Sequence, residues 1–213
     1  MSKTLLGEHN PKTILCGECL AKIYVKEGQC EEAIPILENL LGYWTKVLGP
    51  YNIDTLAAMH ELGIAHKLLG DHEKAILLFN ECYKMRLWQL GSNHKDTLAT
   101  MDNLGNCKYG IGEIDEGILL LEESLKKRRE VEPNTKVLLS SIANLSVLYF
   151  RLERYDDARP LLEELIEKKH STEYVEYVEH GEYAWLLTEY VEYAFKKCID
   201  NRDTTESLEK DRK

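Results

Sequence analysis

Two cysteines near the start of the chain have a spacing that could support chemistry, in the run Cys16-Gly-Glu-Cys19. Cysteine pairs with this spacing form redox centres or supply half of a zinc site. The sequence contains no second pair of this kind, and the pair does not follow a strand pattern. Cys30 and His9 could in principle complete a set of four ligands. We expect instead that Cys16 and Cys19 are small packing residues one turn apart in a helix, with no metal bound.

Four ionisable residues lie close together in the sequence: His60, Glu61, His66 and His72. A catalytic role would require an activated nucleophile or an open metal position beside them. The sequence has no phosphate-binding glycine loop, no G-x-S-x-G turn and no metalloprotease helix motif. We therefore expect no enzyme activity and no cofactor.

The overall composition limits the class of partner. A formal net charge of −10 over 213 residues argues against general nucleic-acid binding, because phosphate groups need a basic surface. No apolar run has the length of a membrane span, and the first residues lack the apolar core of a secretory signal. Most of the six cysteines fall at helical packing positions, which favours reduced thiols and a cytoplasmic location. A protein or peptide partner is the class that remains.

One phrase occurs twice and organises the rest of the sequence. Leu48–Ala57 and Leu90–Ala99 share Leu-Gly, Asp-Thr-Leu-Ala and a following methionine, and Leu6–Thr13 is a weaker copy. Self-similarity at a period of about 40 residues is typical of a stacked repeat protein. Glycines recur at the same spacing between amphipathic runs, where they are expected to end helices. These stops are Gly28, Gly70 and Gly112, and the fourth equivalent position holds Glu153.

Apolar residues at three- and four-residue spacing predict an all-α fold. Successive helices are expected at residues 11–27, 30–47, 53–69, 72–89, 95–111, 114–130, 135–152 and 155–169. The first helix of each pair has an aligned anchor leucine followed directly by a small residue. These anchors are Leu20, Leu62, Leu104 and Leu145.

Each second helix has a small residue of its own at an aligned position. These residues are Ala33, Ala75, Gly117 and Ala158. Small side chains at matched positions allow two helices to approach closely, and the larger residues beside them fill the remaining space. The pattern therefore predicts an antiparallel helical hairpin that is repeated four times.

This combination of Leu-Gly or Leu-Ala, a turn glycine, and then Ala with Leu or Phe in the second helix resembles the tetratricopeptide repeat (TPR). The copies are longer than the ordinary repeat of about 34 residues and are similar to the repeats of kinesin light chains. The resemblance implies a right-handed superhelix of four hairpins, at about 6–47, 48–89, 90–131 and 132–170. Residues 171–199 are expected to form a capping helix that covers the last repeat, and residues 200–213 a disordered charged tail.

The resemblance also implies which side chains face a concave groove lined by the first helices. The groove residues of chemical interest are Lys22, Lys26, His60, Lys67, Asn103, Asn106, Tyr109, Asn144, Phe150 and Arg151. Asn103 and Asn144 would hydrogen-bond a ligand backbone, since an amide both donates and accepts. Basic residues interleaved with aromatic rings favour a short acidic or aromatic-acidic peptide. His66 aligns with Tyr24 and Tyr149 and is expected to be packed in the core.

These features predict a non-catalytic adaptor that binds a peptide in its concave groove. The alternative is a structural subunit of a larger assembly or a homo-oligomer, joined through an uncapped first repeat or the convex face. A third interpretation is a regulatory module from a longer repeat array, because the chain opens within the repeated phrase at Leu6-Gly7.

Overall fold

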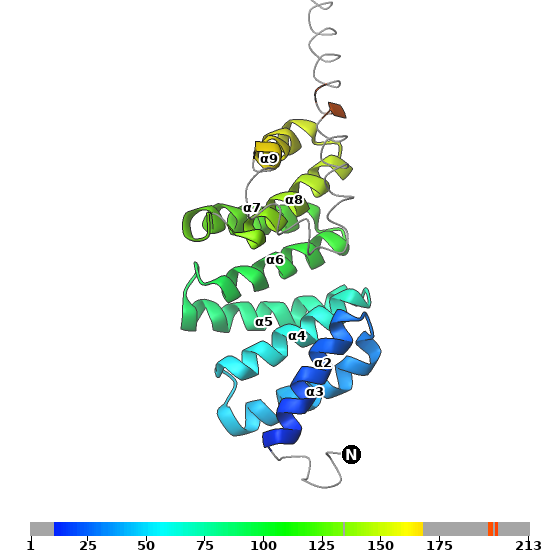
Figure 1. Cartoon of the computed structure of the whole chain (residues 1–213), viewed down its shortest axis with the longest axis vertical. Coiled ribbons are helices and arrows are strands. Elements are labelled where there is room, and N and C mark those ends of the chain that lie inside the picture. Colours follow the sequence, from blue (N-terminus) through cyan, green and yellow to red (C-terminus); the bar gives the residue numbers. More distant parts are fainter. Residues whose placement is uncertain (1–10, 134, 168–195, 198, 200–213) are drawn as a thin grey trace, which may run out of the picture. The chain divides into compact units, whose positions relative to one another are not determined.

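The computed structural model describes residues 11–133, 135–167, 196–197 and 199. Every regular element within these residues is an α-helix (Figure 1). The chain forms two compact units, Met1–Ser124 and Leu125–Lys213, and each is described by itself. None of the described helices has the length and apolarity needed to cross a membrane. The prediction of an all-α fold is confirmed.

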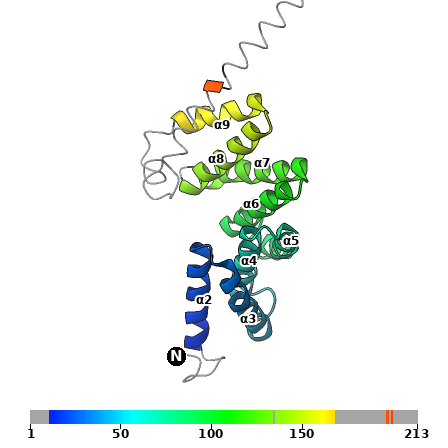
Figure 2. The ribbon, with the colours of Figure 1, turned by 90° about the vertical axis from the view of Figure 1, so that its right-hand side faces the viewer.

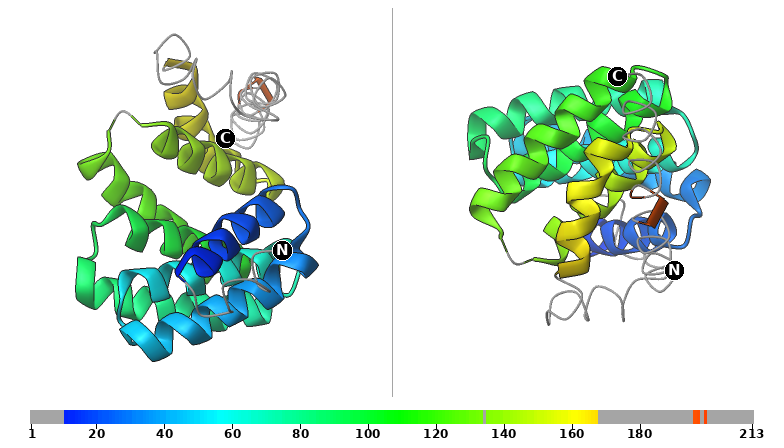
Figure 3. Two further views of the ribbon diagram at one scale, coloured as in Figure 1. Left: turned by 60° about the horizontal axis from the view of Figure 1, so that its bottom comes forward. Right: turned by 90° about the horizontal axis from the view of Figure 1, so that it is seen from above.

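Unit 1 consists of consecutive antiparallel helices. They are α2 (Pro11–Lys26), α3 (Cys30–Leu48), α4 (Ile53–Leu68), α5 (His72–Leu90), α6 (Lys95–Gly110) and α7 (Ile114–Val131), whose last residues pass into unit 2. The helices stack in chain order (Figure 2), and the first helices of successive hairpins, α2, α4 and α6, also contact one another in turn. Figure 3 shows from two further sides that α2, in dark blue, lies at the N-terminal end of this unit.

Unit 2 continues from the end of α7 with α8 (Lys136–Arg151) and α9 (Tyr155–Glu167), which pack together as a hairpin. Leu162 of α9 is fully buried between them. Arg129 at the end of α7 forms an ion pair of 2.5 Å with Glu164 of α9.

The predicted helix boundaries agree with the observed ones to within two residues at every end. The expected capping helix at 171–199 and the charged tail at 200–213 lie outside the described residues, apart from residues 196–197 and 199. Residues 6–10 of the weaker phrase lie outside them as well.

The repeated phrase forms the turn between one hairpin and the next. The second residue of each copy is a glycine at positive φ, Gly49 at 89° and Gly91 at 85°. Three residues later, Asn52 and His94 cap the following helix, because each side chain accepts a hydrogen bond from the backbone N–H two residues ahead. The leucine four residues after each capping residue is buried. The phrase therefore ends one helix, begins the next and anchors it in the core.

The turn inside each hairpin closes with the same backbone hydrogen bond. An N–H donates to the carbonyl five residues earlier, which is the pattern of a Schellman turn. These pairs are Gln29 to Tyr24, Asp71 to His66, Glu113 to Lys108 and Arg154 to Tyr149. Gly28, Gly70 and Gly112 take the positive φ that this turn requires, and Glu153 takes it at 57°. The four predicted helix stops are confirmed, and the fourth adopts the left-handed conformation although it carries a side chain.

In the second and third hairpins, the two helices come so close that a methyl group added to a glycine at the contact would overlap the facing helix. A methyl group added at Gly63 would stand 2.7 Å from the ring of Phe79. One added at Gly105 would stand 2.9 Å from the carbonyl oxygen of Gly117, and one at Gly117 would stand 2.7 Å from the carbonyl oxygen of Gly105. The small residues predicted to allow close packing do so.

The first anchor leucine is an exception to the predicted pattern. Leu62, Leu104 and Leu145 are buried, whereas Leu20 is 42% exposed. Leu62 and Leu104 lie in helices that are covered by a preceding hairpin, and no described element precedes α2. The expectation that Leu20 anchors the core is therefore wrong.

Replacing Gly91 with alanine is expected to lower the free energy of unfolding by about 1–3 kcal/mol, because the residue has φ 85° and ψ 168°, which alanine disfavours. No atom lies within 4 Å of the added methyl group, so the loss comes from the backbone alone. Gly42→Ala is the matched control, since Gly42 is an exposed helical residue in equally open space.

The control is expected to stabilise the protein by about 0.5–1 kcal/mol, because alanine favours the helix. Urea unfolding of the two variants measures whether Gly91→Ala lowers the free energy of unfolding and Gly42→Ala raises it. Equal effects of the two substitutions would contradict the role assigned to the repeated phrase.

Candidate binding surface on the first helices

The groove residues expected in unit 1 come from the neighbouring first helices α2, α4 and α6. The structure brings two of them together directly: Lys67 Nζ on α4 donates a hydrogen bond of 2.6 Å to Asn103 Oδ1 on α6. Asn103 Nδ2 in turn donates to the carbonyl oxygen of Ala99, 3.0 Å away. Asn103 is thereby held in one orientation and fixes the position of the Lys67 ammonium group. We call the surface formed by the expected groove residues of α2, α4 and α6 the first-helix face. Its residues are Lys22, Lys26, Lys67, Asn103, Asn106 and Tyr109.

Lys67 is a partly desolvated cation. Burial lowers the pKa of Lys67 below its ordinary value, and the nearby carboxylate of Asp102 opposes this shift. The partner that accepts its hydrogen bond is a neutral amide. A carboxylate that approached Lys67 from a ligand would therefore meet a positioned charge in a medium of low polarity, where attraction is stronger than in water.

The N-terminal part of the first-helix face carries charges of both signs. Lys22 Nζ on α2 donates to Glu18 Oε1 at 2.7 Å, and this hydrogen bond raises the pKa of Lys22. Burial raises the pKa of Glu61 on α4, whereas the charge of Lys22 lowers it. These three residues line a small pocket together with Trp44 of α3. Lys26 lies one turn beyond Lys22 and is exposed.

The remaining expected residues of unit 1 lie on α6. Asn106 and Tyr109 are half-buried. Both follow Asn103 on the same helix, at three and six residues. An amide and a phenol at these places add neutral donors and an apolar ring to the charges of Lys22 and Lys67.

Three expected groove residues belong to unit 2. Asn144 and Arg151 of α8 are exposed. Phe150 is half-buried, and its ring centroid lies 5.5 Å from the ring centroid of Tyr155. The ammonium group of Lys197 lies 5.6 Å from the ring centroid of Phe150. Phe150 is therefore partly used in contacts within this unit.

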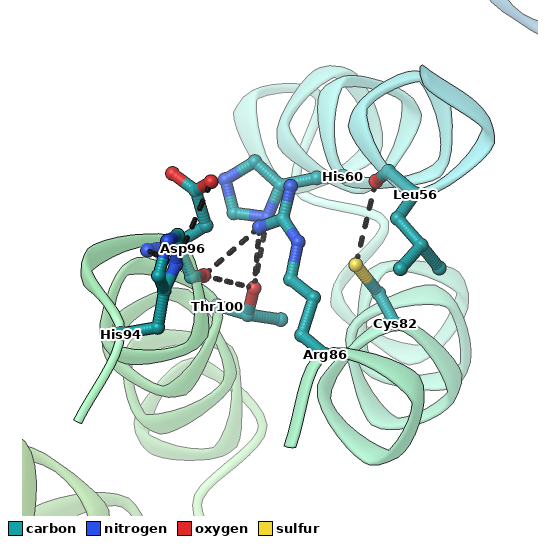
Figure 4. A network of polar contacts seen from close by, with 7 residues as sticks. All are labelled: Leu56, His60, Cys82, Arg86, His94, Asp96 and Thr100. Atoms are coloured by element: carbon teal, nitrogen blue, oxygen red, sulfur yellow. Dashed lines mark hydrogen bonds and ion pairs between the residues drawn. The ribbon is translucent and has the colours of Figure 1, made fainter. Parts of the chain in front are cut away.

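His60 does not lie on an open surface. It is 9% exposed, its ring packs edge-on against Phe79 with centroids 5.4 Å apart, and its Nδ1 lies 3.4 Å from Thr100 Oγ1 (Figure 4). Burial, together with the charges of Arg86 and Lys67, lowers the pKa of His60 to about 3. The expectation that His60 faces the groove is wrong, because the ring fills the space between α4, α5 and α6. The expectation that His66 is packed in the core is confirmed.

A buried arginine at the centre of this region was not predicted from the sequence. Arg86 of α5 is buried, and its Nη1 donates to the carbonyl oxygen of Asp96 and to Thr100 Oγ1, at 2.9 and 2.8 Å (Figure 4). It ties the end of the second hairpin to the start of α6. The signal in the sequence was that Arg86 aligns with Arg128 of the next repeat, so that an arginine recurs at the position that Trp44 occupies in the first repeat.

The cysteines divide into two groups. Cys30, Cys82 and Cys107 are buried packing residues, as expected, whereas Cys16 and Cys19 are exposed on α2. The pair lies one turn apart in a helix, as expected. The expectation that both are packing residues is wrong for the same reason as for Leu20, since nothing described covers that side of α2. Within the described residues, no three His, Cys, Asp or Glu side chains are grouped to hold a metal ion.

Replacing His60 with glutamine is expected to flatten the dependence of stability on acid pH. The pKa of His60 in the folded protein, about 3, lies below the ordinary value of 6.5, so the unfolded chain takes up a proton between these values and the folded chain does not. The contribution of neutral His60 is complete above pH 6.5 and is lost as the pH falls towards 3.

The difference in unfolding free energy between the two proteins should therefore change by up to about 1.4 kcal/mol per pH unit in this window. Urea unfolding at several pH values measures it. Parallel pH profiles for wild type and His60→Gln would contradict the burial of a neutral imidazole.

Similarity to known proteins agrees with this architecture. A tetratricopeptide repeat family model matches residues 13–87 and 96–169. The nearly identical TPR-like repeats of a candidate kinesin light chain from Podospora anserina superpose with a TM-score of 0.68 at 21% identity, over 92% of this chain and 98% of that chain. BtubC (BKLC) from P. vanneervenii superposes with a TM-score of 0.69 at 15% identity, over 98% of this chain and 87% of that chain.

Among curated proteins, none matches the chain. The structural similarities lie at low sequence identity and show the fold. The family model spans well over half of the sequence, on the same helical hairpins that the structure contains. The chain belongs to the tetratricopeptide repeat family.

Proposed function

We propose that the protein is a non-catalytic interaction adaptor whose first-helix face binds a short acidic or aromatic-acidic peptide. Repeats of this family mediate protein–protein interactions, and the free cysteines fit a cytoplasmic setting. The observation that carries the proposal is the hydrogen bond between Lys67 and Asn103, which links two neighbouring first helices and orients a cation.

The expected role of Asn103 is refined by its contacts. Its amide oxygen accepts from Lys67 and one of its N–H groups donates to Ala99, so one N–H remains for a ligand backbone. Lys67 keeps two of its three N–H donors for a ligand carboxylate. Asn103 therefore acts mainly by positioning Lys67, and Lys67 supplies the charge recognition.

The other side chains of the face complement the same ligand. Lys22 and Lys26 add positive charge near the N-terminal end, and Tyr109 offers an aromatic ring. The carboxylates of Glu18 and Glu61 lie beside Lys22 and repel acidic groups of a ligand. Acidic ligand groups are therefore expected on the side of the face where the lysines lie. In unit 2, Asn144 and Arg151 offer the same kinds of group.

A second candidate function is assembly through the exposed side of α2. Leu15, Leu20 and Ile23 are all exposed there, whereas the residues that align with Leu20 and Ile23 in α4, Leu62 and Ala65, are buried. This side is therefore shaped for cover by another helix. A mass that rises with concentration in light scattering, and falls in Ile23→Glu, would support assembly through α2.

The adaptor proposal is tested with peptides selected by the full chain from a random peptide library. The selected peptides are expected to be rich in aspartate and glutamate beside aromatic residues. Replacing Lys67 with methionine should weaken their binding by about tenfold or more, because a charge-assisted hydrogen bond is lost while the apolar stem is kept. Fluorescence anisotropy of the labelled peptides measures the change.

Lys84→Met is the matched control, because Lys84 is an exposed lysine on the second helix α5. It should change the dissociation constant by no more than about twofold, as expected for an exposed residue outside the site. Selected peptides without acidic residues, or equal binding by wild type and Lys67→Met, would show that the first-helix face is not the site.

A further inference from the structure

The two thiols of Cys16 and Cys19 lie on the same side of α2. Successive residues of an α-helix project about 100° apart, so residues three apart project only about 60° from each other. Leu15, Leu20 and Ile23 project within about 70° of the direction midway between the two thiols. All five side chains are exposed. We call these five residues the thiol face of α2.

The opposite side of α2 is the side that packs within unit 1. Ile14, Ala21 and Val25 are buried, and they project about 180° from the centre of the thiol face. Gly17 lies between the thiols in the sequence but faces α3, because a methyl group added there would stand 3.7 Å from Ile36. Figure 2 shows α2 at the margin of the helices of unit 1. The described residues of this unit therefore leave the thiol face open.

The repeat itself does not require thiols at these places. Aligned on the anchor leucines, Cys16 and Cys19 correspond to Ala58 and Glu61 in α4, and the corresponding residues of α6 are not cysteines either. The pair is therefore particular to α2, the first helix of unit 1 that no described hairpin precedes.

We propose that Cys16 and Cys19 supply half of a tetrahedral zinc site, which the same two cysteines of a second copy of this chain complete. Structural zinc takes four ligands, and four thiolates with this C-x-x-C spacing are a common set. With Zn–S bonds of about 2.3 Å, the sulfurs of such a site lie about 3.8 Å apart. Side chains three residues apart on a helix are neighbours, so the two thiols can reach this separation.

The chain supplies two of the four ligands. Within the part of the chain that the structure describes, no three His, Cys, Asp or Glu side chains are grouped to hold a metal ion, so Cys16 and Cys19 have no third ligand beside them there. A second copy brings an identical pair of thiols. Zinc is therefore bound where two chains meet.

The order of residues along the thiol face suits a two-fold axis. The point midway between Cys16 and Cys19 is also midway between Leu15 and Leu20. Two α2 helices that lie antiparallel about this point bring all four thiols to the axis, and Leu15 of each copy then lies opposite Leu20 of the other. The leucines bury their exposed surfaces in this contact and shield the metal from water.

The inference rests on the second candidate function, assembly through α2, and names the chemistry that makes this assembly specific. Thiols lose their protons when they bind zinc, so the assembled state should weaken as the pH falls as well as when the metal is removed. Peptide recognition by Lys67 does not depend on it.

The experiment uses the full-length protein, kept reduced with a phosphine, in zinc chloride or in EDTA. Light scattering and native mass spectrometry are expected to show a dimer that holds one zinc ion, and a monomer in EDTA. Cobalt(II) in place of zinc should give the visible absorption bands of tetrahedral thiolate coordination.

Cys19→Ser removes two of the four thiolates of the dimer. It should weaken dimer formation in zinc by about tenfold or more, because even changes around the ligands of a metal site cost that much affinity. Cys30→Ala is the matched control, because Cys30 is a buried thiol at the start of α3. It should change dimer formation by no more than about twofold. Circular dichroism establishes that both variants are folded.

Zinc that binds without dimer formation overturns the proposal, and so does a dimer that persists in EDTA and in Cys19→Ser. The persistent dimer would leave assembly through α2 standing, whereas a protein that stays monomeric in zinc at every concentration would overturn both. One zinc ion per chain, lost in Cys30→Ala, would show a site within a single chain and would equally contradict the shared one.

Discussion

The close contact between the two helices of a hairpin is the constraint on which the rest of unit 1 depends. Gly105 and Gly117 meet backbone to backbone, and Gly63 meets the ring of Phe79, with no room for a further carbon atom. At this separation the larger apolar side chains pack beside the contact, and each first helix is brought against the next. The first-helix face exists because these contacts set α4 and α6 side by side, within reach of the Lys67–Asn103 hydrogen bond.

Polar groups are built into this packing where successive hairpins join. Arg86 reaches from α5 to the backbone and Thr100 of α6, while His60 stays neutral beside it. A buried charge is tolerated only when its donors are satisfied, so Arg86 requires α6 to keep one position. Asn103 lies on the solvent-facing side of α6, the helix that Arg86 contacts. α6 therefore contributes Thr100 to the packed interior and Asn103 to the proposed binding surface.

The fold could be predicted from the sequence because its signals are local. Glycine stops, capping residues and apolar spacing determine where each helix begins and ends, and the repeats display each signal several times. The misplaced residues depend on neighbours that the local pattern does not contain. Leu20 was assigned to the interior by alignment with later repeats, and Cys16 and Cys19 were expected to be packing residues, although no described hairpin covers α2. His60 was assigned to the groove from the resemblance to the repeat family, although Arg86 and Phe79 of the next helix enclose it.

The constraint at the hairpin contact is tested most directly by the free energy of unfolding of Gly105→Ala. The added methyl group would stand 2.9 Å from the carbonyl oxygen of Gly117, a backbone atom that cannot move without separating the helices. Overpacking of this kind should lower the stability by about 1–3 kcal/mol, although alanine favours a helix. A variant as stable as wild type, or more stable, would contradict the account.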